Sequence, residues 1–195
     1  TKKGIVEKNI KLLVKNKKRI DIIINNAGFS VITKFYDRTD SELNNTINVN
    51  IKGTLNIINS YFKVHKSMKL KKCNIINIGS IYGSMSPDFR VYGKNSSYNS
   101  EIYGATKASV IQLTKYYSVI LSPFNINVNC LSPGGLYNNK KPQKASFIKK
   151  YSLRVPKARM ANTEDLYTGV LFLASSKSDY VSGQNIIIDG GLSSW

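Results

Sequence analysis

The sequence is poor in cysteine and histidine, with two Cys and one His in 195 residues. Cys73 and Cys130 are too far apart to match a metal-binding or redox motif, and two cysteines cannot form a disulfide scaffold. Both lie in apolar, strand-like runs. We therefore expect two buried free thiols, no metal site, and a reducing cytoplasmic environment.

Long hydrophobic runs are also absent. The longest are a few residues, such as Ile22 to Ile24, whereas a membrane-spanning helix requires about 20. Thr1 to Gly4 lead into a Lys-rich stretch that lacks the apolar core of a secretory signal. A mean hydropathy of -0.23 is typical of a globular protein, and 195 residues fit one domain. We expect residues 1–195 to form a single domain.

Acidic residues are scarce: 11 Asp and Glu face 29 Lys and Arg, a net charge of +18. Such a charge is common in nucleic-acid-binding proteins. However, Lys outnumbers Arg 24 to 5, and Ile and Asn are abundant too, as an AT-rich genome produces. The lysines interleave with apolar residues as on solvated helix faces, without the aromatics that stack on bases. We expect no nucleic-acid partner, while an anionic small substrate stays open.

Apolar periodicity predicts alternating helices and strands. The predicted helices cover residues 5–18, 40–68, 101–121 and 163–174. The predicted strands cover residues 20–25, 74–78, 125–131 and 185–189. Parallel neighbours need crossover connections, so this order predicts an α/β fold with a doubly wound parallel sheet. The Lys-rich segment 138–157 is expected to be a loop or short helix over a site.

The Gly-rich turn of a dinucleotide-binding fold is missing. In such folds a first strand, a G-x-G-x-x-G turn and a helix N-terminus hold the pyrophosphate. No such spacing occurs here, and the chain opens on a helix. We expect the carboxyl-terminal part of a Rossmann fold that lacks its first β-α-β-α-β portion, about 60 to 70 residues. Poor dinucleotide binding and an apolar sheet edge at residues 20–25 are expected to follow.

Two Tyr-x-x-x-Lys pairs occur in the sequence. Tyr103 and Lys107 lie one turn apart on a predicted helix, which places a phenol and an ammonium on the same face. A nearby cation lowers the pKa of a phenol from about 10, as acid/base work near pH 7 requires. Tyr137 and Lys141 have the same spacing but abut Pro142, where a helix is not expected.

The context of the strands favours the first pair. Ser80 follows the strand 74–78, residues 25–28 (Asn-Asn-Ala-Gly) end the preceding strand, and Pro133 and Gly134 end the next one. Parallel sheets bind ligands at the carboxyl ends of their strands. The helix that carries Tyr103 connects two of these strands, so we expect one site at this rim.

In these motifs the chain resembles a short-chain dehydrogenase/reductase over essentially all of its length. The motifs that carry the resemblance are residues 25–28, 50–53, Ser80, Tyr103 with Lys107, 132–134, 182–184 and 189–191. The resemblance implies an oxidoreductase that interconverts a secondary alcohol and a ketone, with NAD or NADP as cofactor. It implies four catalytic residues: Tyr103 as the acid/base, Ser80 holding the substrate oxygen, Lys107 binding the nicotinamide ribose and lowering the pKa of Tyr103, and Asn50 holding a water in the proton path.

The resemblance also implies the binding residues. For the cofactor these are Asn25, Asn26, Ala27, Gly28, Tyr103, Lys107, Pro133, Gly134 and Leu136. For the substrate they are Ser80, Tyr82 and Gly135. Where relatives often carry Thr after the Pro-Gly turn, this chain has Asn138, which removes one expected phosphate contact.

The stretch from Tyr82 to Ser100 is about ten residues longer than expected and lies beside the site, so we assign it to substrate recognition. With neighbouring motifs it resembles the oxidoreductases of flagellin modification and of nonulosonic-acid or surface-polysaccharide synthesis. A sugar phosphate or nucleotide sugar is then the expected substrate. The segment 140–159 contains no acid and suits an anionic ligand.

A second hypothesis is a non-catalytic, truncated Rossmann-like interaction module. A chain without its phosphate-binding turn is compatible with it. The resemblance also implies a homo-oligomer, a dimer or tetramer, because the helices around Asn50 and Tyr103 commonly pack against a second subunit in this family. No membrane partner is expected.

Overall fold

The computed structural model describes residues 3–17, 19–93 and 97–195. Its helices are α1 (Lys3–Lys17), α2 (Asp40–Ile47), α3 (Thr54–Met68), α4 (Glu101–Leu121), α5 (Ala145–Ser152) and α6 (Tyr167–Ala174). Its strands are β1 (Ile22–Asn25), β2 (Ile32–Thr33), β3 (Cys73–Ile78), β4 (Tyr98–Asn99), β5 (Ile126–Pro133) and β6 (Asn185–Ile188). None of the described helices is both long and apolar enough to cross a bilayer.

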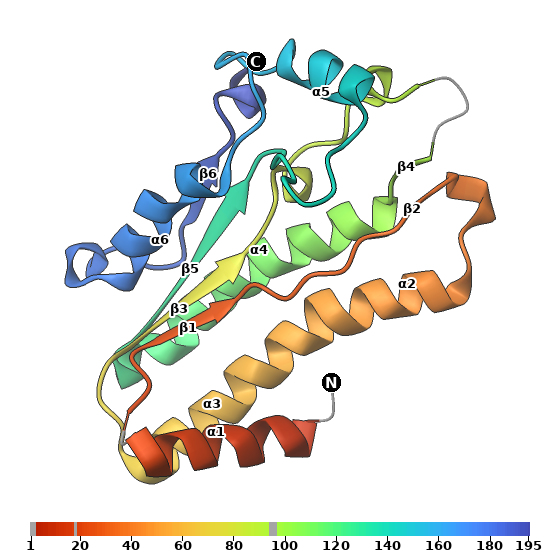
Figure 1. Ribbon diagram of the computed structural model, residues 1–195. Coiled ribbons are helices and arrows are strands. Elements are labelled where there is room, and N and C mark those ends of the chain that lie inside the picture. Colours follow the sequence, from red (N-terminus) through yellow and green to blue (C-terminus); the bar gives the residue numbers. More distant parts are fainter. Residues whose placement is uncertain (1–2, 18, 94–96) are drawn as a thin grey trace.

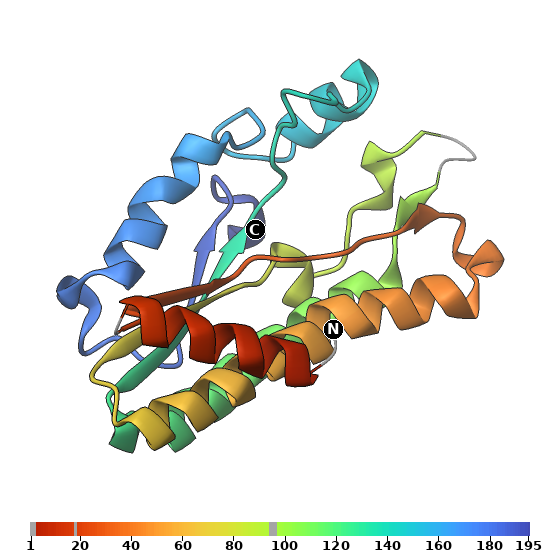
Figure 2. The same ribbon diagram turned by 60° about the horizontal axis from the view of Figure 1, so that its bottom comes forward.

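Four strands form a parallel sheet in the order β1-β3-β5-β6, with helices between successive strands (Figure 1). Helices α1, α3 and α4 lie on one face of the sheet, and α6 lies on the other (Figures 1 and 2). The predicted α/β fold with a doubly wound parallel sheet is confirmed. Its central strands β3 and β5 are buried along almost their whole length, because both of their faces are covered.

The main core lies between the sheet and the three helices on its first face. Ile10 and Val14 lie four residues apart on α1 and pack against α3, where Ile58, Tyr61 and Val64 are fully buried. This i,i+4 spacing is what turns one face of each helix toward the sheet. Cys73 and Cys130 are free and buried in β3 and β5, as predicted.

The long helix predicted over residues 40–68 is interrupted. It begins with a capping box, in which Thr39 and Glu42 bond reciprocally, and continues to Ile47. Residues 48–53 then form a π-helical turn before α3 begins at Thr54. A π turn inserts one residue per turn and redirects the side chains within it. The prediction of one uninterrupted helix is therefore wrong at residues 48–53.

The segment between β3 and α4 contains structure that periodicity did not predict. Two short 3₁₀ helices, Ile81–Gly83 and Phe89–Val91, are followed by β4, which pairs antiparallel with β2. This two-stranded ribbon brings residues 32–33 beside residues 98–99, above the amino end of α4 (Figure 1).

Two other boundaries differ modestly from the expectation. The segment 138–157, predicted to be a loop or a short helix, contains the short helix α5. The predicted helix 163–174 starts with a 3₁₀ turn, Thr163–Leu166, and becomes α-helical at Tyr167.

Candidate active site

Three neighbouring strands end at one rim of the sheet, and the predicted motifs follow them there. β1 leads into residues 26–28, β3 into Ser80, and β5 into Gly134. A backbone hydrogen bond from the Gly79 N–H to the Leu131 oxygen (2.8 Å) keeps the second and third strand ends together. The sheet therefore gathers these short polar and Gly-bearing turns into one place, as its parallel order requires.

Helix α4 carries Tyr103 and Lys107 past this rim. Ser100 caps the helix by accepting a hydrogen bond from the Tyr103 N–H (3.2 Å), which fixes where the first turn begins. The Lys107 Nζ lies 5.7 Å from the centre of the Tyr103 ring, and it donates a hydrogen bond to the Ile78 oxygen (2.7 Å). The phenol and the ammonium are thus on the same face of the helix, as predicted.

Ser80 faces Tyr103 from the end of β3. The serine hydroxyl is near enough to the phenol to lower its pKa, and the Ser80 Oγ accepts a hydrogen bond from the Tyr82 N–H (3.2 Å). Ser80 and Lys107 are buried. Their burial restricts the serine hydroxyl and the ammonium, and both line one cleft with the phenol, so the three groups form one constellation.

Burial controls the pKa values of this constellation. It raises the pKa of Tyr103 above its usual value, and the neighbouring Ser80 hydroxyl opposes that rise. Burial lowers the pKa of Lys107. The expected lowering of the Tyr103 pKa by Lys107 is not found: the net shift is upward, and the opposing contribution comes from Ser80. At neutral pH the phenol is therefore protonated and able to donate.

Asn50 lies in the π turn and is buried beneath the site. Its amide donates to the Phe29 oxygen (3.0 Å) and the Thr106 Oγ1 (2.9 Å), and its Oδ1 accepts from the Phe29 N–H (2.8 Å). These three bonds tie the loop after β1 to α4. The residue that sequence reasoning placed in mid-helix thus joins two walls of the site, while its role in holding a water stays a prediction.

A cleft of about 380 Å³ runs along the rim. Ten of the predicted binding and catalytic residues line it: Asn26, Gly28, Ser80, Tyr82, Tyr103, Lys107, Pro133, Gly134, Gly135 and Leu136. Asn25, Ala27 and Asn50 are not among its lining residues. Asn25 instead donates to the Asn77 Oδ1 (2.8 Å) on the neighbouring strand, so its side chain holds the sheet together below the cleft.

Tyr151 was missed by sequence reasoning. It lies on α5, and its hydroxyl accepts a hydrogen bond from the Gly135 N–H (2.6 Å) in the loop that lines the cleft. A Cβ on Gly135 would lie 2.5 Å from the Tyr151 ring, so only glycine permits this approach. The sequence signal for Tyr151 is its helical spacing from Phe147 and Ile148, which predicts one apolar helix face. This spacing does not reveal that Tyr151 contacts Gly135.

The second Tyr-Lys pair does not form a site. Residues 137–141 are not helical, and the Asn138 Oδ1 accepts hydrogen bonds from the Lys140 and Lys141 N–H groups (both 3.0 Å) in a local turn. Asn138 does not line the cleft.

A parallel α/β sheet with serine, tyrosine and lysine at its carboxyl rim defines the class of the protein: an oxidoreductase of the dinucleotide-binding type. The comparisons agree. A family model described as enoyl-(acyl carrier protein) reductase matches residues 1–193. The chain belongs to the short-chain dehydrogenase/reductase family, whose members depend on NAD or NADP.

Two relatives illustrate the sequence similarity, and both are named as 3-oxoacyl-(acyl-carrier-protein) reductases. The chain is 35% identical over 194 residues to a 3-oxoacyl-(acyl-carrier-protein) reductase FabG from Thermotoga maritima, covering 97% of this chain and 71% of that protein. It is 32% identical over 189 residues to FabG from Staphylococcus epidermidis, covering 96% and 72%. The chain thus spans about 71% of such relatives.

Solved structures are similar throughout the fold. A short-chain dehydrogenase from Leptospira borgpetersenii with bound NAD+ is 45% identical with a TM-score of 0.86, covering 95% of this chain and 70% of that one. A gluconate 5-dehydrogenase from Burkholderia cenocepacia, in complex with NADP and tartrate, is 26% identical with a TM-score of 0.85, covering 97% and 71%. Neither comparison supports the predicted branch of flagellin or polysaccharide oxidoreductases.

Proposed function

We propose that this protein interconverts a secondary alcohol and a ketone, with Tyr103 as the acid/base and NAD or NADP as the hydride carrier. The observation that carries the proposal is the convergence of Ser80, Tyr103 and Lys107 on one cleft at the rim of the sheet. A protonated phenol beside a serine in one cleft is arranged to give a proton to a carbonyl oxygen that the serine holds.

The residues present fit the nicotinamide-ribose end of the cofactor. At Gly28 an added Cβ would lie 3.6 Å from the Lys107 Nζ and 3.9 Å from the Asn50 Oδ1, so the glycine leaves the space above the ammonium open. An ammonium has three N–H donors, of which the Ile78 oxygen takes one. Lys107 would hold the ribose hydroxyls, and Pro133, Gly134 and Leu136 would face the nicotinamide ring.

The chain's own groups perform the proton chemistry in this proposal. When bound, the nicotinamide supplies or accepts the hydride. Ser80 holds the substrate oxygen, and Tyr103 donates its proton to that oxygen in the reducing direction or takes it in the oxidising one. Lys107 orients the cofactor beside the phenol, and Asn50 fixes the loop that carries Gly28 against α4.

For the substrate, an anionic carbohydrate such as a sugar phosphate or nucleotide sugar is supported by the exposed lysines of the segment 140–159. Two arginines of that segment already have partners, however: Arg154 pairs with Asp88 (2.9 Å) and Arg159 with Asp165 (2.6 Å). A second candidate is a ketone with an apolar chain, favoured by a large apolar cavity beside the cleft. We favour this second class.

We also propose that the protein acts as a homo-oligomer in a reducing compartment, the cytoplasm. Exposed apolar side chains on the carboxyl half of α4, Tyr116, Val119 and Ile120, support an interface on this helix. The free, buried thiols of Cys73 and Cys130 support a reducing compartment.

The decisive test is Tyr103→Phe, measured as oxidation of NADH or NADPH with a panel of small ketones. We expect turnover to fall at least about 100-fold while cofactor affinity changes little, because only the proton donor is lost. Tyr167→Phe, at an exposed position of α6 away from the cleft, serves as the control and should keep the wild-type rate. A Tyr103→Phe protein with normal turnover would refute the proposal.

A further inference from the structure

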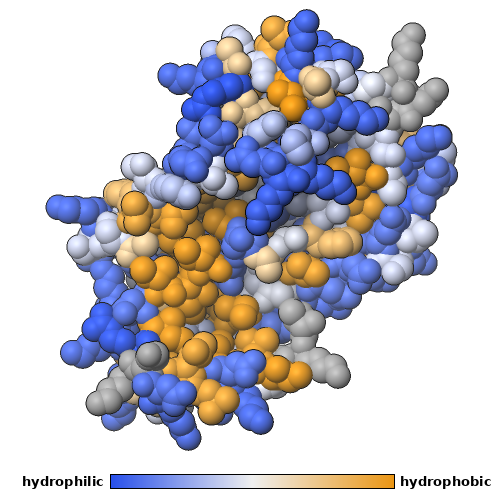
Figure 3. All heavy atoms as spheres, in the orientation of Figure 1, coloured by the Kyte–Doolittle hydropathy of each residue, from blue (hydrophilic) through white to orange (hydrophobic). Residues whose placement is uncertain are grey.

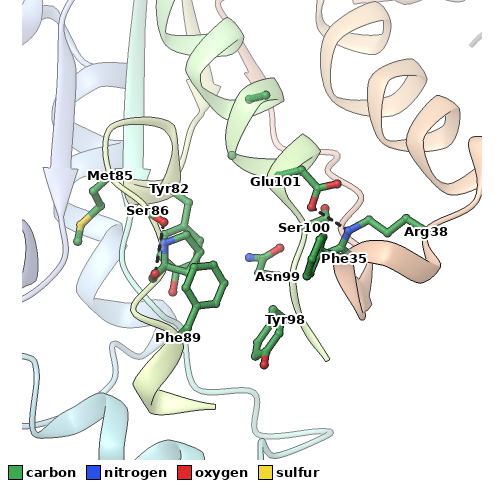
Figure 4. A pocket seen from close by; sticks show the side chains of 13 residues that line it. Phe35, Arg38, Tyr82, Met85, Ser86, Phe89, Tyr98, Asn99, Ser100 and Glu101 are labelled. Carbon is green, nitrogen blue, oxygen red and sulfur yellow. Dashed lines mark hydrogen bonds and ion pairs between the residues drawn. The ribbon is translucent and has the colours of Figure 1, made fainter. Parts of the chain in front are cut away.

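A second cavity of about 650 Å³ adjoins the cleft. It lies between residues 82–89, residues 98–100, the first turn of α4 and the 3₁₀ helix Phe35–Asp37 (Figure 4). Tyr82 and Asn99 line both the cavity and the cleft. The two spaces are therefore neighbours, and Gly104, which follows Tyr103 on α4, lines the larger one.

Aromatic and apolar side chains form most of this cavity. Phe89 and Tyr82 lie on one side, Phe35 lies on the other, and Tyr98 lies between them (Figure 4). Phe89 contacts Tyr98 edge to face with ring centres 5.2 Å apart, and Tyr98 contacts Tyr92 in the same way at 5.4 Å. These contacts hold the walls in place without a ligand.

The two charged groups of the cavity, Arg38 and Glu101, pair with each other. The guanidinium of Arg38, whose side chain is only 3% exposed, donates to the Glu101 Oε2 and to the Thr33 Oγ1, both at 2.8 Å. The Asn99 Oδ1 accepts from the Ser30 hydroxyl (2.7 Å). An anionic ligand would have to compete with Glu101 for the one buried cation of the lining, so the cavity disfavours phosphate.

An apolar ligand in this cavity would remove apolar surface of its aromatic walls from water. Phe35 is 67% exposed and Phe89 is 53% exposed, so apolar surface on both sides of the cavity faces water. Covering such surface is favourable in proportion to its area. A volume of about 650 Å³ is within the range of cavities that bind drug-sized ligands.

We propose that this aromatic cavity binds the remote, apolar part of the ketone or alcohol substrate, an aliphatic or aryl chain, while the reacting oxygen lies between Ser80 and Tyr103. The inference rests on the proposed function for the position of the reacting end. It names the substrate class that residues 82–89 and 98–100 select: secondary alcohols and ketones with an extended apolar group on one side.

Direct binding of a ketone series tests the inference. Ligand-observed NMR would measure the affinities of 2-butanone, 2-hexanone and 2-octanone for the full chain without cofactor. We expect affinity to rise about fourfold for each added methylene, and glucose 6-phosphate and UDP-glucose not to displace 2-octanone. Equal affinities across the series, or displacement of 2-octanone by UDP-glucose, would overturn it.

Two variants locate the binding. Phe89→Ala removes one wall and should weaken 2-octanone binding about tenfold, whereas Ala105→Trp fills the cavity from an exposed position of α4 and should abolish it. Because the two changes act in opposite ways on packing, a folding defect in one leaves the other informative. Tyr167→Ala, which removes an exposed ring on α6, is the matched control and should leave 2-octanone affinity unchanged. Unchanged affinity in Ala105→Trp would place the ligand elsewhere and overturn the inference.

Failure of this inference and failure of the proposed function give different results. Turnover of 2-butanone depends on Tyr103 in the proposed function and makes little use of the aromatic cavity. A protein that reduces 2-butanone through Tyr103 but binds all ketones equally refutes the cavity assignment alone. Chain-length-dependent binding with turnover unaffected by Tyr103→Phe refutes the reaction and retains the cavity.

Discussion

At the residue scale, the proximity of Ser80 to Tyr103 links structure to pH dependence. Burial raises the pKa of Tyr103, and Ser80 partly offsets the rise. The phenol is the required form for ketone reduction, and the phenolate is the required form for alcohol oxidation. Reduction should therefore be constant through neutral pH and fall as pH rises through the raised pKa, whereas oxidation should increase about tenfold per pH unit below that pKa.

Replacing Ser80 tests this account. Ser80→Ala removes the contribution that lowers the pKa of Tyr103, so the alkaline limb of the reduction profile should move to higher pH. The maximal rate should also fall about 100-fold, because the substrate oxygen loses a donor. Ser109→Ala on α4, whose hydroxyl bonds only within the helix to the Ala105 oxygen, is the control. A rate loss in Ser80→Ala without a shifted profile would contradict the coupling to Tyr103.

Sequence was informative about Tyr103, Lys107 and Ser80 because their placement depends on local rules. The i,i+4 spacing and the strand end determine where these side chains point once the helix and the sheet exist. The direction of the Tyr103 pKa could not be predicted in this way. It depends on how deeply the ring is buried by segments distant in sequence, and burial outweighs the neighbouring groups.

At the element scale, the π turn at residues 48–53 shows what periodicity does not predict. The sequence Asn-Val-Asn-Ile-Lys-Gly contains no proline, and its helical pattern continues on both sides. The π turn instead coincides with tertiary contacts, since Asn50 forms hydrogen bonds to Phe29 and Thr106 on two other segments of the chain. The capping box at Thr39, in contrast, was predictable because all of its partners lie within four residues.

Helix α5 positions the loop after β5 through one hydrogen bond. Tyr151→Phe keeps the ring but loses the acceptor for the Gly135 N–H, which costs about 1 kcal/mol. Because this loop lines the end of the cleft where we propose that the cofactor binds, we expect the KM for NADH or NADPH to rise about fivefold with kcat nearly unchanged.

Steady-state kinetics with varied cofactor would measure the effect, and Tyr167→Phe on α6 provides a matched loss of an exposed hydroxyl. The role of Tyr151 as a positioning residue would be wrong if the cofactor KM stayed within twofold of wild type. A purely structural role would instead lower thermal stability without separating KM from kcat.

At the scale of the whole molecule, the two faces of the sheet are covered unequally. The first face packs against α1, α3 and α4, whereas α6 covers the second face only in part, and apolar side chains gather beside it (Figure 3). Ile22 and Ile24 of β1 are 42% and 46% exposed, while Ile23 between them packs into the main core. In the described sheet β1 pairs with β3 alone, so apolar surface and an open strand edge coincide there.

The same substitution should therefore change the stability very differently at neighbouring residues of β1, because successive side chains of a strand point to opposite faces. Ile23→Lys places a charge in the core and should lower the free energy of unfolding by about 3 kcal/mol. Ile24→Lys should change it by less than about 0.5 kcal/mol. It should also reduce concentration-dependent association, because a lysine interrupts the apolar edge. Urea unfolding and light scattering over a concentration series would measure both effects, and equal loss of stability in the two variants would show that the second face is covered after all.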